Sequence, residues 1–105
     1  MPKGGYIPNA GNVGNMGEFL KSSGFGSDIA DSITKTSKNF QGQTVYRVTE
    51  KIDGVFKRGD QLYLDAQHMN HLEVFNKNNQ FVKVLNLDGT LNRIKTDAGE
   101  GRTLK

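Results

Sequence analysis

The sequence contains no cysteine and no tryptophan, and it has only two prolines and two histidines. Without cysteine the chain forms neither a disulfide scaffold nor a cysteine-ligated zinc site, and it has no thiol nucleophile. It has no run of about 18 apolar residues, so we expect no membrane-spanning helix, and its start lacks the apolar stretch of a signal peptide. These absences exclude several protein classes and fit either an oxidising or a reducing compartment.

The motifs of two further classes are missing. No serine follows Ser37 and no Gly-x-Ser-x-Gly elbow occurs, which excludes the serine hydrolases that depend on that turn. The glycine-rich stretch GNVGNMG lacks the strand–loop–helix context of a phosphate-binding loop.

The composition allows one small domain. Of the 105 residues 34% are hydrophobic, and Leu, Ile, Val and Phe together make up about a quarter, enough for a small core. The net charge is +3, and residues 77–105 hold six basic and three acidic side chains. This basic segment is suited to contact phosphates.

The chain divides into a lead and a domain. Residues 1–15 are rich in Gly, Pro and Asn, and we expect a flexible lead or linker there, followed by a single domain over 16–105. Two short helices are predicted at the start of the domain. The first runs over 16–23 with Asn15 as its cap, and the second begins at Ser27 and ends near Thr36.

Alternating apolar residues after position 43 predict strands. The short connections between them are rich in Gly, Asn, Lys and Asp, so neighbouring strands should be antiparallel. A fifth strand or a helical turn is expected over 90–94. We therefore predict an α+β fold, with short N-terminal helices packed on a twisted antiparallel sheet of four to five strands. The four strands expected are 44–50, 61–65, 71–75 and 80–86.

The alternation also assigns each side chain to a face of the sheet. The apolar set should pack under the helices as the core: Leu62, Leu64, Leu72, Val74, Val82 and Val84. The opposite face then carries a mixture of acidic, basic and aromatic side chains: Tyr63, Asp65, His71, Glu73, Phe75, Phe81, Lys83 and Leu85.

Both histidines of the chain, His68 and His71, lie close in sequence to Asp65 and Glu73. An imidazole beside carboxylates is suited to general acid–base catalysis near neutral pH. The same groups could ligate a divalent metal, but the expected strand ends and turn leave the two histidines without a shared helical register, so we predict no metal site. The ordinary alternatives are a turn cap at Asp65, a surface His71 and a Glu73–Lys83 pair across the sheet.

Basic and aromatic side chains near this cluster are candidates for RNA contact, because RNA binding needs phosphate partners and stacking surfaces. Lys83, Arg93 and Lys95 could stabilise charge on a phosphate. The full set of predicted RNA-binding residues is Tyr63, Lys83, Arg93, Lys95 and Arg102.

The stretch YLDAQHMNHLEVF at 63–75 resembles a family of nuclease domains. These are the C-terminal domains of bacterial toxins, in particular the rRNA-cleaving colicins and the related tips of contact-dependent growth inhibition proteins. In those colicins a strand ends in Asp, a Ser-Gln-His turn follows, and a Glu on the next strand completes a catalytic set that a late Arg supports. The resemblance covers residues 59–102 and leaves out the N-terminal helices.

Carried over, the resemblance assigns catalytic roles to Asp65, His68 and Glu73. The segment from His68 to Glu73 is one residue longer than in the colicin pattern, so His71 is an alternative imidazole. Arg93 and Arg102 both fit the late arginine.

The resemblance implies a bacteriocin-like toxin domain. It would be a metal-independent endoribonuclease without a cofactor that cleaves tRNA or 16S rRNA and leaves a 2′,3′-cyclic phosphate. Its partners would be the RNA and a cognate immunity protein, and some relatives cut tRNA with help from elongation factor Tu. Such a domain is exported as the tip of a larger toxin and acts in the cytoplasm of the target cell. The alternative is a non-catalytic RNA- or protein-binding module.

Overall fold

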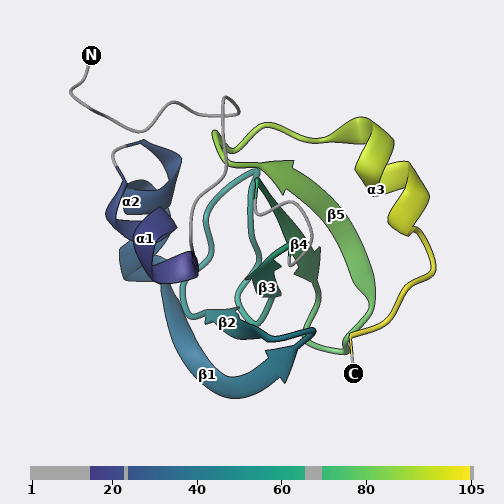
Figure 1. Ribbon diagram of the computed structural model, residues 1–105, viewed down its shortest axis with the longest axis horizontal. Coiled ribbons are helices and arrows are strands. Elements are labelled where there is room, and N and C mark those ends of the chain that lie inside the picture. Colours follow the sequence, from purple (N-terminus) through teal and green to yellow (C-terminus); the bar gives the residue numbers. More distant parts are fainter. Residues whose placement is uncertain (1–14, 23, 66–69, 105) are drawn as a thin grey trace.

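The structure is a computed structural model that describes residues 15–22, 24–65 and 70–104. Within these residues five antiparallel strands form one sheet in the order β1-β2-β3-β4-β5, and short helices lie at both ends of the sheet (Figure 1). The predicted α+β fold is confirmed. The elements are α1 (Met16–Lys21), α2 (Phe25–Ile29), a 3-10 turn (Ala30–Ser32), β1 (Ile33–Phe40), β2 (Gln43–Val48), β3 (Gln61–Leu64), β4 (His71–Phe75), β5 (Phe81–Asn86) and α3 (Arg93–Gly99).

The N-terminal region confirms one predicted helix and corrects the other. Asn15 caps α1, where its side chain accepts a hydrogen bond from the Glu18 N–H at 2.8 Å. The second helix does not continue to Thr36, because Ile33 already pairs with Val48 in the sheet. The β-branched residues that begin β1 favour a strand and outweigh the helical spacing of Ile29 and Ile33. The predicted lead at 1–14 falls outside the described residues.

The centre of the core beneath the N-terminal helices consists of side chains that the sequence predicted there. Leu62, Leu64, Leu72 and Val74 are fully buried there. The helices contribute Phe19 to the same core. Burial of these side chains is the main stabilising contribution to the packing of helix on sheet.

Strand β5 contains a β-bulge. Its pairing with β4 passes from Phe75↔Phe81 to Val74↔Lys83, so Val82 is an extra residue in the strand. An extra residue shifts the alternation of the strand by one position from there on.

The bulge makes three of the predicted face assignments wrong, those of Lys83, Val84 and Leu85, and it leaves Val82 outside the core. Leu85 packs in the core beneath the helices, and Val84 lies on the opposite face, paired with Glu73. Val82 is 40% exposed. Lys83 points toward the helix side, where its ammonium donates to the Val55 carbonyl.

The opposite face is a second core rather than an exposed aromatic surface. Tyr63 and Phe75 are almost completely buried, at 1% and 0% exposure. The C-terminal segment covers them, because the Leu104 N–H donates to the Asn79 carbonyl at 2.9 Å and holds the Leu104 side chain inside. The cluster consists of Val45, Tyr63, Phe75 and Leu104, with Phe40 and Phe81 at its border.

Helix α3 packs against β5, and its position depends on close contacts. Leu91 forms an isolated bridge with Leu85, and the helix then begins at Arg93. The Thr96 hydroxyl accepts a hydrogen bond from the Val84 N–H at 2.9 Å. This places the helix beside the second core.

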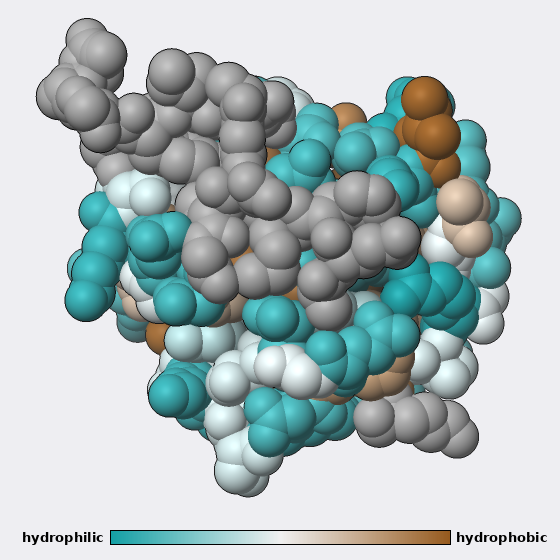
Figure 2. All heavy atoms as spheres, in the orientation of Figure 1, coloured by the Kyte–Doolittle hydropathy of each residue, from teal (hydrophilic) through white to brown (hydrophobic). Residues whose placement is uncertain are grey.

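The described surface is mostly hydrophilic in the view of Figure 2, and the most hydrophobic area lies over α3. Ile94 of that helix is 82% exposed. No helix of the described segments is long and apolar enough to cross a membrane.

A Gly99→Ala substitution tests the approach of α3 to the sheet. A Cβ at Gly99 would lie 2.6 Å from the Phe81 ring, so the ring or the helix must shift. Overpacking of this kind lowers stability by about 1–3 kcal/mol, which urea unfolding will measure. Glu100→Ala, at an exposed neighbouring position, is the control. Equal stability of the two variants would contradict this close packing.

Candidate active site

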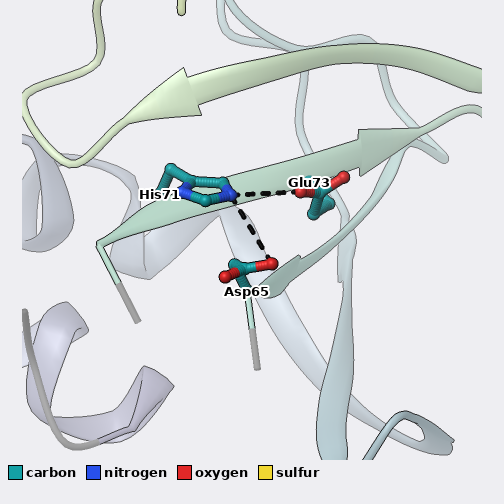
Figure 3. A group of neighbouring side chains, drawn as sticks. All are labelled: Asp65, His71 and Glu73. Carbon is teal, nitrogen blue, oxygen red and sulfur yellow. Dashed lines mark ion pairs between the residues drawn. The ribbon is translucent and has the colours of Figure 1, made fainter. Parts of the chain in front are cut away.

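An imidazole lies between two carboxylates at the junction of β3 and β4. Residues two apart on a strand share a face, so His71 and Glu73 project together. Asp65 follows β3 and reaches them because its N–H donates to the His71 carbonyl at 3.0 Å. The His71 Nε2 atom is 3.2 Å from Glu73 Oε2 and 3.5 Å from Asp65 Oδ1 (Figure 3).

The cluster is secluded and its histidine is fixed in place. The side chains of His71 and Glu73 are only 4% and 5% exposed, and that of Asp65 is 18% exposed. On the other side of the ring, His71 Nδ1 is 2.9 Å from Asn70 Oδ1. Both ring nitrogens therefore face side-chain oxygen atoms, which hold the imidazole in one orientation.

Arg102 completes the cluster from the C-terminal segment. Its Nη1 atom donates to Glu73 Oε1 at 2.6 Å, and its Nη2 atom donates to the Tyr63 hydroxyl at 3.2 Å. The guanidinium also lies 5.8 Å from the ring centres of both Phe75 and Phe81. The aromatic core thus supports the arginine while its charged end faces the carboxylate.

These contacts set the ionisation of two groups. Burial by itself raises the pKa of Glu73, but the hydrogen bond from His71 and the charge of Arg102 outweigh it, so that pKa lies below its usual value. Burial and the nearby Glu73 carboxylate raise the pKa of Tyr63 to about 12, against the opposing effect of Arg102. At neutral pH Glu73 is therefore an ionised acceptor and Tyr63 keeps its proton.

The cluster lies in a cleft of about 250 Å³ that is bordered by polar residues from four parts of the chain. Its lining consists of Gln41, Asp65, His71, Glu73, Lys95, Ala98, Gly99 and Arg102. A larger cavity, about 350 Å³, lies elsewhere and is walled by Val55, Phe56, Val82 and Lys83 among others. Because the larger cavity holds no imidazole, we place the candidate site in the smaller one.

The structure brings together three of the predicted catalytic residues, Asp65, His71 and Glu73. The fourth, His68, lies outside the described residues. Of the two arginines that fit the late arginine of the resemblance, Arg102 contacts Glu73, whereas Arg93 is exposed on α3 and does not line the cleft.

Some of the predicted RNA-binding residues lie at the cleft and others do not. Lys95 borders the cleft. Tyr63 was expected on an exposed aromatic face, but it is buried, and its hydroxyl accepts a hydrogen bond from Arg102. Lys83 lies away from the cleft, 5.8 Å above the Phe56 ring, because the bulge in β5 turned it to the other face.

The same three groups could hold a divalent cation. One ligand atom each from Asp65, His71 and Glu73 lies within 4.8 Å of the others, and such a donor set suits a metal ion. Arg102 opposes metal binding, since its positively charged guanidinium already donates to one oxygen of Glu73. The arrangement therefore favours proton transfer over metal ligation.

Gln41 is a cleft residue that the sequence interpretation missed. The sequence predicts a helix that ends near Thr36 and the next strand only from residue 44, so it does not predict the hairpin that carries Gln41. The signal for it was present, since β-branched residues precede the Gln41–Gly42 pair and an alternating strand follows.

Comparison with known proteins found no matching family model, no similar curated protein and no similar solved structure.

The lowered pKa of Glu73 predicts a dependence of stability on pH. The ionised carboxylate stabilises the fold, so this contribution is complete above the ordinary carboxyl pKa of 4.5 and is lost as the pH falls through the lower pKa of the folded state. Glu73→Gln resembles the protonated form and should be less stable than the wild type at pH 7, with the difference shrinking below pH 4.5.

Urea unfolding from pH 7 to pH 3 measures this difference, and Glu100→Gln, at the exposed residue that follows α3, controls for the loss of one carboxylate. A wild-type advantage over Glu73→Gln that stayed constant with pH would contradict the assignment.

Proposed function

We propose that this chain is a metal-independent endoribonuclease. The supporting observation is the buried His71 between Asp65 and Glu73, with Arg102 held on the same glutamate. Cleavage of RNA without a metal needs a base, an acid and positive charge near the phosphate. All three lie in the one cleft that also contains Lys95.

In the proposed reaction Glu73 is the general base and His71 the general acid. Glu73, ionised because of Arg102 and His71, removes the proton of a ribose 2′-hydroxyl. The freed oxygen attacks the adjacent phosphorus, the bond from phosphorus to the 5′-oxygen breaks, and that oxygen takes a proton from His71. The products are a 2′,3′-cyclic phosphate and a 5′-hydroxyl, and Asp65 orients the imidazole throughout.

Arg102 and Lys95 supply the charge that the reaction needs. Negative charge develops on the phosphoryl oxygens as the 2′-oxygen attacks, and cations fixed beforehand stabilise it. Arg102 is fixed by Glu73, Tyr63 and two aromatic rings. Lys95, on the exposed side of the cleft, is placed to meet the backbone of an incoming strand.

The biological setting in the proposal rests on the resemblance of residues 63–75 to toxin nucleases. On this basis the chain is the tip of an exported bacterial toxin that cuts tRNA or 16S rRNA in the cytoplasm of a target cell. A cognate immunity protein would protect the producing cell, and elongation factor Tu is a further candidate partner, because it assists some of the relatives that cut tRNA.

Single substitutions in the cluster should greatly slow RNA cleavage and leave RNA binding in place. We expect His71→Ala and Glu73→Gln to lower the rate of RNA cleavage by about 10²–10⁴-fold, the usual contribution of one acid or base group. The measurement is cleavage of total bacterial RNA in EDTA, together with binding of a fluorescent RNA to the same proteins. Glu50→Gln, an exposed position outside the cleft, is the control.

Three results would overturn the proposal. If the wild type cut RNA only after a divalent metal replaced EDTA, the metal-independent mechanism would be wrong. If cleavage were the same in the wild type and both variants, His71 and Glu73 would have no catalytic part. If the wild type bound RNA without cutting it, the chain would be a binding module.

The two lysines that the sequence placed near the site should differ in effect. Lys95→Ala should weaken RNA binding, because Lys95 borders the cleft. The slope of the logarithm of the binding constant against the logarithm of the salt concentration should fall by the amount that about one ionic contact contributes. Lys83→Met keeps the apolar stem over Phe56 and lies away from the cleft, so RNA binding should not change. Titrations at several salt concentrations compare them, and an equal loss in both variants would place the RNA elsewhere.

A further inference from the structure

The larger cavity, of about 350 Å³, is separate from the acid–base cleft, and the described lining residues of the two do not overlap. Its volume lies within the range of sites that enclose a small organic molecule. One wall is a tight turn in the connection between β2 and β3. There the Ile52 N–H donates to the Phe56 carbonyl at 3.0 Å, and the Phe56 N–H donates to the Ile52 carbonyl at 2.9 Å. These paired hydrogen bonds hold the wall in place without a ligand.

The other wall is the β-bulge of β5. Consecutive residues of a regular strand point to opposite faces of a sheet. Val82 and Lys83 nevertheless both line this cavity, because the bulge changes the direction of the side chains. Bulges are over-represented beside functional sites. This one presents an apolar side chain, 40% exposed at Val82, and a cation to the same cavity.

The charged groups of the lining leave the Lys83 ammonium without a carboxylate partner. Asp53 pairs with Lys51 at 3.3 Å. Asp60 is buried, and its Oδ2 atom accepts a hydrogen bond from the Lys57 N–H at 2.8 Å. Among the described residues, no carboxylate forms an ion pair with Lys83, although the charge of Asp60 acts on it from a greater distance. The cavity therefore has a cation to offer to a ligand.

The Lys83 ammonium is half-buried and donates to the Val55 carbonyl. An ammonium has three donors, so two more can bind a ligand. Burial lowers the pKa of Lys83, and the negative charge of Asp60 offsets only part of this effect. An anion beside the ammonium would compensate for its lost hydration.

We propose that this cavity binds a small carboxylate with an aliphatic tail. The tail would lie against the apolar walls that Val55, Phe56 and Val82 form, and the carboxylate would accept hydrogen bonds from Lys83. An inorganic anion would leave the apolar walls unmatched, and a neutral hydrocarbon would leave the ammonium unmatched. The inference is independent of the proposed function, because the acid–base cluster lies in the other cleft.

The test compares hexanoate, hexan-1-ol and acetate as ligands of the full chain, which separates the contribution of the charge from that of the tail. Calorimetric titration measures the affinities, and NMR shifts of the Val55 and Phe56 amides locate the site. We expect hexanoate to bind the wild type about tenfold more tightly than hexanol, as a hydrogen bond to a charged group would give. Acetate should bind at least about tenfold more weakly than hexanoate, because it lacks the tail.

Two variants test the two halves of the site. Lys83→Met keeps the apolar stem over Phe56 and removes the charge, so it should bind hexanoate no more tightly than hexanol. Its affinity for hexanol should equal that of the wild type, which also shows that it is folded. Val82→Thr, at an exposed position, should weaken both ligands by the same factor, about threefold. Lys95→Ala, on the acid–base cleft, is the control and should bind both as the wild type does.

Equal affinities of the wild type for hexanoate and hexanol would overturn the inference, and so would a preference for hexanoate that persists in Lys83→Met. If Lys83→Met does not fold, unchanged affinities in Val82→Thr would still contradict the site. Shifts confined to amides around His71 would place the ligand in the other cleft and refute the assignment. A wild type that binds neither ligand would also overturn the inference and leave the cavity to a protein partner.

Discussion

The contact between Arg102 and Glu73 is the interaction on which the candidate site depends. It joins the C-terminal segment to strand β4, which lies between β3 and β5, across 29 residues of sequence. A carboxylate as buried as that of Glu73 is unfavourable unless a positive charge and hydrogen bonds compensate for its lost hydration. Arg102 binds one oxygen of Glu73, which leaves the other oxygen for His71. The same pair therefore keeps Glu73 ionised and the imidazole oriented.

The second core supports the Arg102–Glu73 pair. Phe75 and Phe81 lie beneath the guanidinium, and the Tyr63 hydroxyl accepts its second hydrogen bond. The segment that carries Arg102 is itself tied to β5, because the Phe81 N–H donates to the Arg102 carbonyl at 3.1 Å. Aromatic packing on this face thus replaces the exposed stacking surface that the sequence suggested, and it provides rigidity to the site.

The sequence was sufficient to predict features that follow from local patterns, such as the face of a strand on which a side chain lies. It was not sufficient for features that depend on where the C-terminal segment packs. Strand alternation was sufficient to place Asp65 and Glu73 on one face, since the period of two is geometric. It failed at Lys83 because one extra residue, Val82, reversed the faces of β5. The choice of Arg102 over Arg93 depends on how the C-terminal segment runs back beside β5, and no local pattern encodes that path.

The chemical nature of the cut ends tests the central claim, acid–base cleavage by His71 and Glu73, most directly. A defined RNA incubated with the wild-type chain in EDTA should give fragments that end in a 2′,3′-cyclic phosphate and begin with a 5′-hydroxyl, as mass spectrometry of the fragments would show. Such ends form only if the ribose 2′-oxygen is the nucleophile. Fragments with a 3′-hydroxyl and a 5′-phosphate, or intact RNA, would contradict the mechanism.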